Sequence, residues 1–181
     1  SVGNVFTTLE CQVAGTVANL IPDQGPVNQP LTGVLRLKYS IPFQQLNSLV
    51  SAHLICFKIG LDQSSIRFVS GRTMAADISP NNASDYTHIR TLRIIATAVN
   101  AIKLGAEPWL GRGNNVHTRQ ALSTRIDQIL GALKEGGSLG FYSFDIASEN
   151  IGPLMDTLLI TLTLRPTHEI DKIRIDVTIQ R

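Results

Sequence analysis

The chain has 181 residues, of which 43% are hydrophobic and 17% are charged, and its formal net charge is +2. This length suits one domain that buries its own core, and the low charged fraction indicates buried contacts. A net charge this small, with scattered basic residues, argues against a protein that binds nucleic acid by neutralising phosphates. No apolar run approaches the roughly 18 residues that cross a bilayer, so we expect neither nucleic acid contact nor membrane insertion.

The chain opens with a predicted short helix. Leu9, Val13 and Val17 recur at helical spacing, and the pattern stops at residues 22–30, where three prolines predict an extended loop. The next stretch, residues 31–40, alternates poorly but ends in the manner of a strand. We therefore expect a helix, a loop and then a strand.

Residues 43–55 predict a second helix that runs into an apolar strand over residues 54–60. Residues 65–75 predict a further strand that places Ile66, Phe68 and Ser70 on one face.

Two long amphipathic helices are predicted in the middle of the chain. The first spans about residues 84–106, with Ser84 or Asp85 as its N-cap, and the second spans about residues 116–134 and ends at Gly136 and Gly137. We expect a core shared by both helices, formed by Ile89, Leu92, Val99, Ile102, Leu122, Ile126, Ile129 and Leu133.

The rest of the chain predicts strands, over residues 139–148, 156–166 and 170–181. In the last of these, Ile173, Ile175, Val177 and Ile179 alternate with Lys172, Arg174, Asp176 and Thr178, which is the pattern of a half-buried strand. No strand follows it, so it pairs either within its own sheet or with another chain. The predicted fold class is α+β, with two long central helices packed on a mostly antiparallel sheet.

No motif in the sequence predicts catalysis or metal binding. His53, His88, His117 and His168 stand in separate segments without ligand spacing, and Cys11 and Cys56 are expected to be free, buried thiols. Asp85 and His88 lie three residues apart, but an N-cap explains the aspartate. Trp109 is expected to pack beneath the two helices. We therefore predict no catalytic residue, no metal ligand and no cofactor.

The order of several short motifs resembles the tail sheath proteins of contractile phages and contractile injection systems. A strand that ends in a Gly-x-Thr turn leads into a Ser-Asp-Tyr helix start with an arginine-rich first turn, followed by a Pro-aromatic loop with an asparagine and then a second helix. The matching residues are Gly71, Thr73, Ser84, Asp85, Tyr86, Arg90, Arg93, Pro108, Trp109 and Asn114. The resemblance extends over nearly the whole chain.

The resemblance implies the inner, C-terminal core of a sheath subunit, with residues 1–169 as the core and residues 170–181 as an arm. Sheath subunits are usually longer, so the chain is either part of one or an unusually small relative. The implied partners are copies of the chain in stacked rings, an inner tail tube protein, and baseplate and tail terminator proteins. The implied location is a virion tail or contractile particle assembled in the bacterial cytoplasm.

In this family, terminal arms lie in the sheets of neighbouring subunits. The resemblance therefore implies that residues 170–181 are donated to another copy through a linker at Pro166 and Thr167. Two other functions stay open at this stage. One is a non-contractile ring or tail-completion protein with the same core, and the other is a small hydrolase that uses Asp85 and His88.

Overall fold

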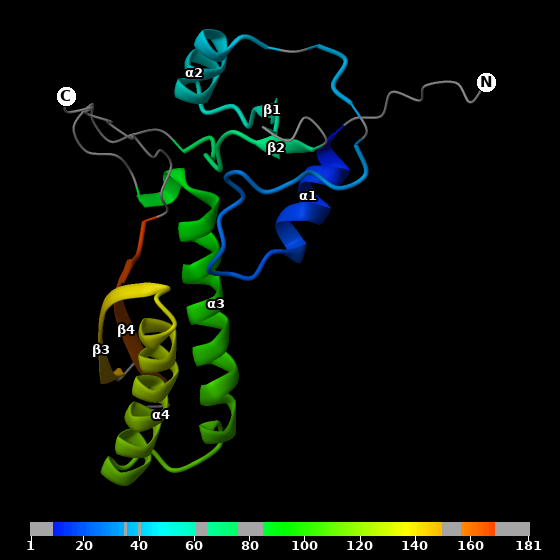
Figure 1. Cartoon of the computed structure of the whole chain (residues 1–181). Helices are drawn as coiled ribbons and strands as arrows, with labels where there is room; N and C mark the ends of the chain where they lie inside the picture. Colours follow the sequence, from blue (N-terminus) through cyan, green and yellow to red (C-terminus); the bar gives the residue numbers. More distant parts are fainter. Residues whose placement is uncertain are drawn as a thin grey trace, which may run out of the picture. The chain divides into compact units, whose positions relative to one another are not determined.

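The computed structural model describes residues 9–34, 36–39, 41–60, 65–75, 85–149 and 157–168. They belong to two compact units, one that includes the chain up to Arg90 and one that runs from Thr91 to His168. Figure 1 shows that both units contain helices and strands, which is a mixed α+β composition. The predicted strand over residues 170–181 lies outside the described residues.

The first unit contains two short helices and a two-stranded sheet. Helix α1 spans Glu10–Asn19 and α2 spans Phe43–Ser51, and strands β1 (Phe57–Ile59) and β2 (Ile66–Phe68) pair antiparallel. The expected helices and the two strands at these positions are confirmed. Ile66, Phe68 and Ser70 are buried, as their alternation predicted.

The strand expected over residues 31–40 is wrong for the residues of this stretch that the structure describes. Pro30, just before this stretch, forms an isolated bridge to Arg67. The backbone N–H of Leu31 donates to the backbone oxygen of Ile66 at 2.7 Å. Val34 and Leu37 pack against the buried cluster that contains Leu31, so these three residues recur at a spacing of three. A strand would instead present every second residue to the cluster.

The start of helix α3 (Ile89–Ala106) also differs from the prediction. Residues 85–87 form a short 3-10 helix, so Asp85 is not the N-cap, and Ser84 lies outside the described residues. The cause is backbone pairing with the Gly71–Thr73 turn. The N–H of Thr73 donates to Thr87 at 2.7 Å and the N–H of Ile89 donates to Gly71 at 2.9 Å. Those bonds occupy groups that a longer helix would need for itself.

The second unit consists of most of α3, a short 3-10 helix at Glu107–Trp109, helix α4 (Val116–Glu135) and strands β3 (Leu139–Glu149) and β4 (Thr157–Pro166). In Figure 1, α4 follows α3 after a short connection and lies against β3. The core of this unit is a cluster of buried residues from α3, α4 and β3: Ile94, Ala98, Ile102, Leu122, Ile126, Leu130 and Leu139.

The predicted core is correct for α4 and partly wrong for α3. Ile102, Leu122 and Ile126 are buried as expected, and Ile129 and Leu133 pack against them. Leu92, however, is 38% exposed. The buried stripe of α3 instead runs through Ile94 and Ala98 to Ile102. Apolar residues occur on several sides of this helix, so periodicity alone did not select the stripe.

Helix α4 ends as the two glycines predicted. Gly137 has a φ of +80°, and the N–H groups of Gly137 and Ser138 donate to Lys134 and Leu133 at 3.0 Å each. This is a Schellman motif, in which a glycine adopts the left-handed conformation without a side-chain clash. It turns the chain directly into β3.

Strands β3 and β4 form an antiparallel ribbon, confirming the predicted pairing of the segments over residues 139–148 and 156–166. Phe144 lies opposite Leu162 and Ile146 opposite Ile160. The described strands thus make two separate two-stranded sheets, where one sheet was expected.

Candidate assembly surfaces

The β3–β4 ribbon has one face in the core and one exposed face. Seven residues of the inner face pack against the buried cluster: Tyr142, Phe144, Ile146, Leu158, Ile160, Leu162 and Leu164. On the outer face, Phe141 and Leu159 are each more than 40% exposed, and the Arg165 guanidinium lies 5.9 Å from the Phe141 ring. Strict alternation along both strands produces this division.

Each strand of the ribbon has one edge without a strand partner among the described residues. The edge of β3 adjoins a groove of about 320 Å³ that β3 shares with α4. On the strand side it is lined by Phe144, Asp145 and Ile146, and on the helix side by Val116, Arg119, Gln120 and Ser123. A strand edge next to a groove can bind an extended segment by main-chain hydrogen bonds and hold alternate side chains.

A polar contact fastens α4 over β3. The Tyr142 hydroxyl donates to Asp127 at 2.9 Å, and the Lys134 ammonium lies 5.8 Å from the Tyr142 ring. The hydrogen bond to Asp127 raises the pKa of Tyr142, because it stabilises the protonated phenol, and burial adds to this effect.

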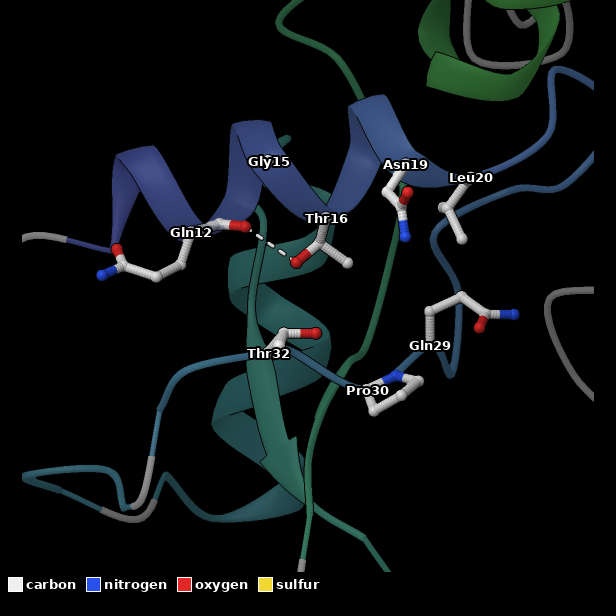
Figure 2. Close-up of a pocket in the computed structure, with 8 residues that line it drawn as sticks. All are labelled: Gln12, Gly15, Thr16, Asn19, Leu20, Gln29, Pro30 and Thr32. Carbon is white, nitrogen blue, oxygen red and sulfur yellow. Dashed lines mark hydrogen bonds between the residues drawn. The ribbon is translucent and has the colours of Figure 1, made fainter.

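In the first unit, a pocket of about 560 Å³ lies between α1 and the loop that follows it. Figure 2 shows its lining, with Gln12, Thr16 and Asn19 on the helix and Gln29, Pro30 and Thr32 on the loop. The Thr16 hydroxyl donates to the backbone oxygen of Gln12 at 2.7 Å. Every lining residue is uncharged at neutral pH, so this pocket holds no acid–base pair.

Several residues of the sheath-like motif meet around the Gly71–Thr73 turn. The Thr73 hydroxyl donates to the backbone of Tyr86 at 2.6 Å, next to the two backbone bonds that start α3. Arg90 is buried and donates to the Asp23 carboxylate at 2.6 Å and to its backbone oxygen at 2.5 Å. These residues fix the loop geometry of the first unit. Arg93 is half-buried, and the side chain of Asp85 lies outside the described part.

The other motif residues, Pro108, Trp109 and Asn114, belong to the connection between α3 and α4. Trp109 packs against the core cluster, as expected, and Arg112 lies over its ring at 5.8 Å. The Asn114 side chain donates to the Ser148 hydroxyl at 3.0 Å, which ties this connection to the end of β3.

The four histidines do not converge. The ring Nδ1 of His88 lies 3.0 Å from the Thr87 hydroxyl and that of His53 lies 3.2 Å from the backbone oxygen of Thr73, whereas His117 and His168 are exposed. Neither pocket includes His88. Within the described ranges, no three potential metal ligands cluster and no helix is long and apolar enough to cross a membrane.

The cysteine prediction is half wrong. Cys56 is buried and free, and burial raises the pKa of its thiol, whereas Cys11 is exposed on α1. No residue of α1 is fully buried, because only Val13 and the preceding Leu9 pack against the cluster of this unit.

Sequence reasoning missed Asp23 and the residues of the β3 groove. Asp23 is 67 positions from Arg90, so no local pattern connects the two. The groove left a weak signal, because Val116, Arg119, Gln120 and Ser123 recur at i, i+3, i+4 and i+7 along one side of α4.

No family model matches the sequence, and no curated protein matches it. Solved structures do. A chain from the anti-feeding prophage baseplate aligns with a TM-score of 0.74 at 18% identity, over 92% of this chain and 48% of that one. The contracted helical sheath of the anti-feeding prophage aligns with a TM-score of 0.71 at 19% identity, over 92% of this chain and 48% of that one. The sheath tail protein of Listeria innocua aligns with a TM-score of 0.68 at 11% identity, over 85% of this chain and 37% of that one.

The chain therefore spans about half the length, or less, of these structures. The structural alignments extend over most of the chain. At sequence identities this low, they show a shared fold and nothing finer. The resemblance that the motif order predicted is confirmed in three dimensions. This chain has the fold of contractile tail sheath proteins.

Proposed function

We propose that the chain is the core of a sheath subunit that polymerises as stacked rings around an inner tube and contracts to drive that tube through a cell envelope. The observation that carries this proposal is the fold shared with a helical sheath in its contracted state. Contraction needs no cofactor in this scheme. Packed interfaces between copies have discrete arrangements, so a trigger can release a whole lattice from one arrangement to another.

Residues 170–181 are the arm that links copies in this proposal. They number twelve, close to the eleven residues of β3, and a strand of that length can pair along the whole open edge. Their apolar side, which includes Ile173, Ile175 and Val177, suits the groove between β3 and α4. Main-chain bonds supply affinity and the groove supplies specificity.

The position of the linker needs a correction. Pro166 is the last residue of β4, and Thr167 donates through its backbone N–H to Ser138 at 3.0 Å and through its hydroxyl to Gly137 at 2.7 Å. These two residues are held in the second unit. In this proposal the arm and its linker therefore begin after His168.

A matched pair of groove variants tests the arm proposal. Ser123 lines the groove, so Ser123→Arg places a long side chain in it. Thr124, the next residue, is exposed and does not line the groove, so Thr124→Arg is the matched control. We expect Ser123→Arg to abolish assembly seen by electron microscopy while circular dichroism stays unchanged, and Thr124→Arg to assemble. Equal assembly of both variants contradicts the groove as the acceptor.

Deleting residues 170–181 tests the same proposal from the donor side. The truncated chain is expected to be folded and monomeric, and assembly should fail. A truncated chain that assembles like the intact one contradicts the donated arm.

The similar chain from the anti-feeding prophage baseplate favours one alternative, a non-contractile ring with the same core. Electron microscopy of the assembled protein separates the two functions. Long tubes that shorten on treatment with a mild denaturant support the sheath, and single rings that never stack support the alternative. Association with baseplate and terminator proteins, and assembly in the bacterial cytoplasm, belong to either form of the proposal.

A further inference from the structure

The pocket of the first unit plays no part in the proposed assembly. Its volume of about 560 Å³ lies in the range of small-molecule sites. One wall is a side of α1 and the other is the loop that carries Gln29, Pro30 and Thr32 (Figure 2). No residue that lines it also lines the groove between β3 and α4, so it is a separate site.

Both walls of the pocket are held by contacts within the first unit. In the loop wall, the backbone oxygen of Gln29 accepts from Phe68 N–H at 3.1 Å, and Leu31 N–H donates to Ile66 at 2.7 Å. In the helix wall, Val13 packs against the buried cluster of this unit. A ligand therefore does not have to order the two walls when it binds, which favours affinity.

The pocket offers hydrogen-bonding groups that the fold leaves uncommitted. Figure 2 shows one hydrogen bond among the lining residues, from the Thr16 hydroxyl to the Gln12 backbone. The side chains of Asn19, Gln29 and Thr32 form no hydrogen bond within the described residues. The Gln12 amide oxygen is buried and also has no partner among them. A rotation about the last torsion of this side chain, which is a soft torsion, lets the amide bond to a ligand.

Gly15 lies in the middle of α1 and lines the pocket. Glycine in a helix interior destabilises the helix relative to alanine. Close packing does not require it here, because beyond the adjoining helix backbone a Cβ added at Gly15 would meet no atom within 4 Å. A side chain at this position would extend into the pocket, so the glycine keeps the pocket open.

The lining indicates the chemistry of the ligand. No lining residue is charged, so an ionic group would lose hydration without gaining a counter-charge. Amide and hydroxyl side chains both donate and accept hydrogen bonds, as the neighbouring hydroxyls of a sugar do. Leu20 and Pro30 add apolar surface, against which the C–H face of a sugar ring can lie.

An extended peptide suits the pocket less well. A peptide that adds to a strand needs a free edge over several residues. The loop wall pairs with β2 only around Pro30, and the chain then turns at Gly33, which has a φ of +83°. The edge that remains is too short for a ladder of main-chain hydrogen bonds.

We propose that this pocket binds a neutral sugar unit, either free or at the end of a neutral glycan. Asn19, Gln29 and Thr32 bond the sugar hydroxyls, Gln12 reorients to bond a further hydroxyl, and Gly15 leaves the space. The inference goes beyond the sheath function and does not depend on it, because the pocket and the proposed arm groove lie in different units.

Two pocket variants and one control test the site on the full chain. Gly15→Leu fills the pocket, and Asn19→Leu removes a hydrogen-bonding group. Ala14→Leu places a leucine at an exposed position of α1 that does not line the pocket.

The probes are the neutral disaccharides maltose, cellobiose and N,N′-diacetylchitobiose. Glucuronate serves as a charged sugar, and a capped tetrapeptide of serine and alanine serves as a main-chain probe. Saturation-transfer NMR measures binding of each probe. The same chains are applied to immobilised neutral glycans, and thermal unfolding is recorded for every variant.

We expect a neutral sugar to bind the unaltered chain, and Gly15→Leu and Asn19→Leu to weaken this binding at least about tenfold, with Ala14→Leu close to the unaltered chain. Gly15→Leu should melt at the same or a higher temperature, because leucine favours a helix more than glycine does. Its loss of binding is then not a loss of folding.

Binding of the disaccharides supports a site for the free sugar, and binding of immobilised glycans alone supports a site for a terminal unit. No binding of any disaccharide or neutral glycan overturns the proposal. Binding that neither pocket variant weakens overturns it as well, and so does a preference for glucuronate or for the tetrapeptide. A lower melting temperature of Gly15→Leu contradicts the open space at Gly15.

Discussion

Asp23 and Arg90 are 67 positions apart, and their contact shows how a single ion pair fixes a long loop of the first unit. Arg90 is buried, whereas the Asp23 side chain is 38% exposed. The guanidinium makes two bonds to the same residue, one to its carboxylate and one to its backbone. The backbone bond survives a side-chain substitution, so removing the carboxylate removes one contact and the compensating charge.

We predict that Asp23→Ala lowers the free energy of unfolding by about 1–3 kcal/mol, because a buried charge loses its partner. Asp23→Asn keeps an acceptor and should cost less. Urea unfolding of both variants measures the difference. A loss below about 0.5 kcal/mol for Asp23→Ala, as for ordinary surface changes, contradicts this role for the ion pair.

Tyr142 supports a prediction about pH. Its pKa is raised in the folded protein by the hydrogen bond to Asp127. The contribution of this bond is therefore fully present below the ordinary tyrosine pKa of about 10 and is lost as the pH rises through the folded value. Tyr142→Phe should cost about 0.5–1 kcal/mol at neutral pH.

That cost should shrink above about pH 10, because the ionised phenol no longer donates to Asp127. Unfolding curves of the unaltered chain and of Tyr142→Phe across this range provide the measurement. Parallel profiles for the two proteins contradict the assigned contact.

At the scale of elements, α3 supplies one stripe to the core of the second unit. Ile94 is 1% exposed, whereas Leu92, two positions earlier, is 38% exposed. We predict that Ile94→Ala costs about 2–5 kcal/mol, as deletions in a packed core do. Leu92→Ala, a matched change on the same helix, should cost no more than about 1 kcal/mol.

Denaturant unfolding of these two variants measures which side of α3 is buried. Similar losses at both positions contradict the observed stripe and restore the one predicted from periodicity.

The elements differ in how well local sequence predicted their ends. The Schellman motif at Gly137 is local, so it was visible in the sequence. The start of α3 is not local, since it depends on backbone pairing with residues 71–73. A cap at Asp85 was reasonable chemistry that this tertiary pairing overrode.

At the scale of the whole molecule, the proposed assembly depends on a strand that pairs outside its own subunit. We predict that Ile175→Pro prevents assembly, because proline removes a ladder hydrogen bond and disrupts a paired strand. The free energy of unfolding of the monomer should not change. Thr178→Ser, which keeps the backbone donor, should assemble normally.

Electron microscopy and denaturant unfolding of both variants provide the test. Loss of monomer stability in Ile175→Pro places the strand in its own sheet and contradicts the donated arm.

The sequence by itself determined the types of most elements and the kind of fold. Helical spacing, strict alternation and paired glycines each act over a few residues, so α1, α2, α4, β3 and β4 lie close to where these patterns predicted them. The order of short motifs also predicted the sheath fold that the structural comparisons confirm.

Only the tertiary structure decided which apolar stripe of α3 is buried, what Arg90 binds, and where the groove between β3 and α4 lies. Apolar residues stand on several sides of α3, so the buried stripe depends on what packs against it. Asp23 and Arg90 meet through chain reversals that no local pattern encodes. The groove combines residues from β3 and α4, and a surface of this kind exists only once those elements have packed.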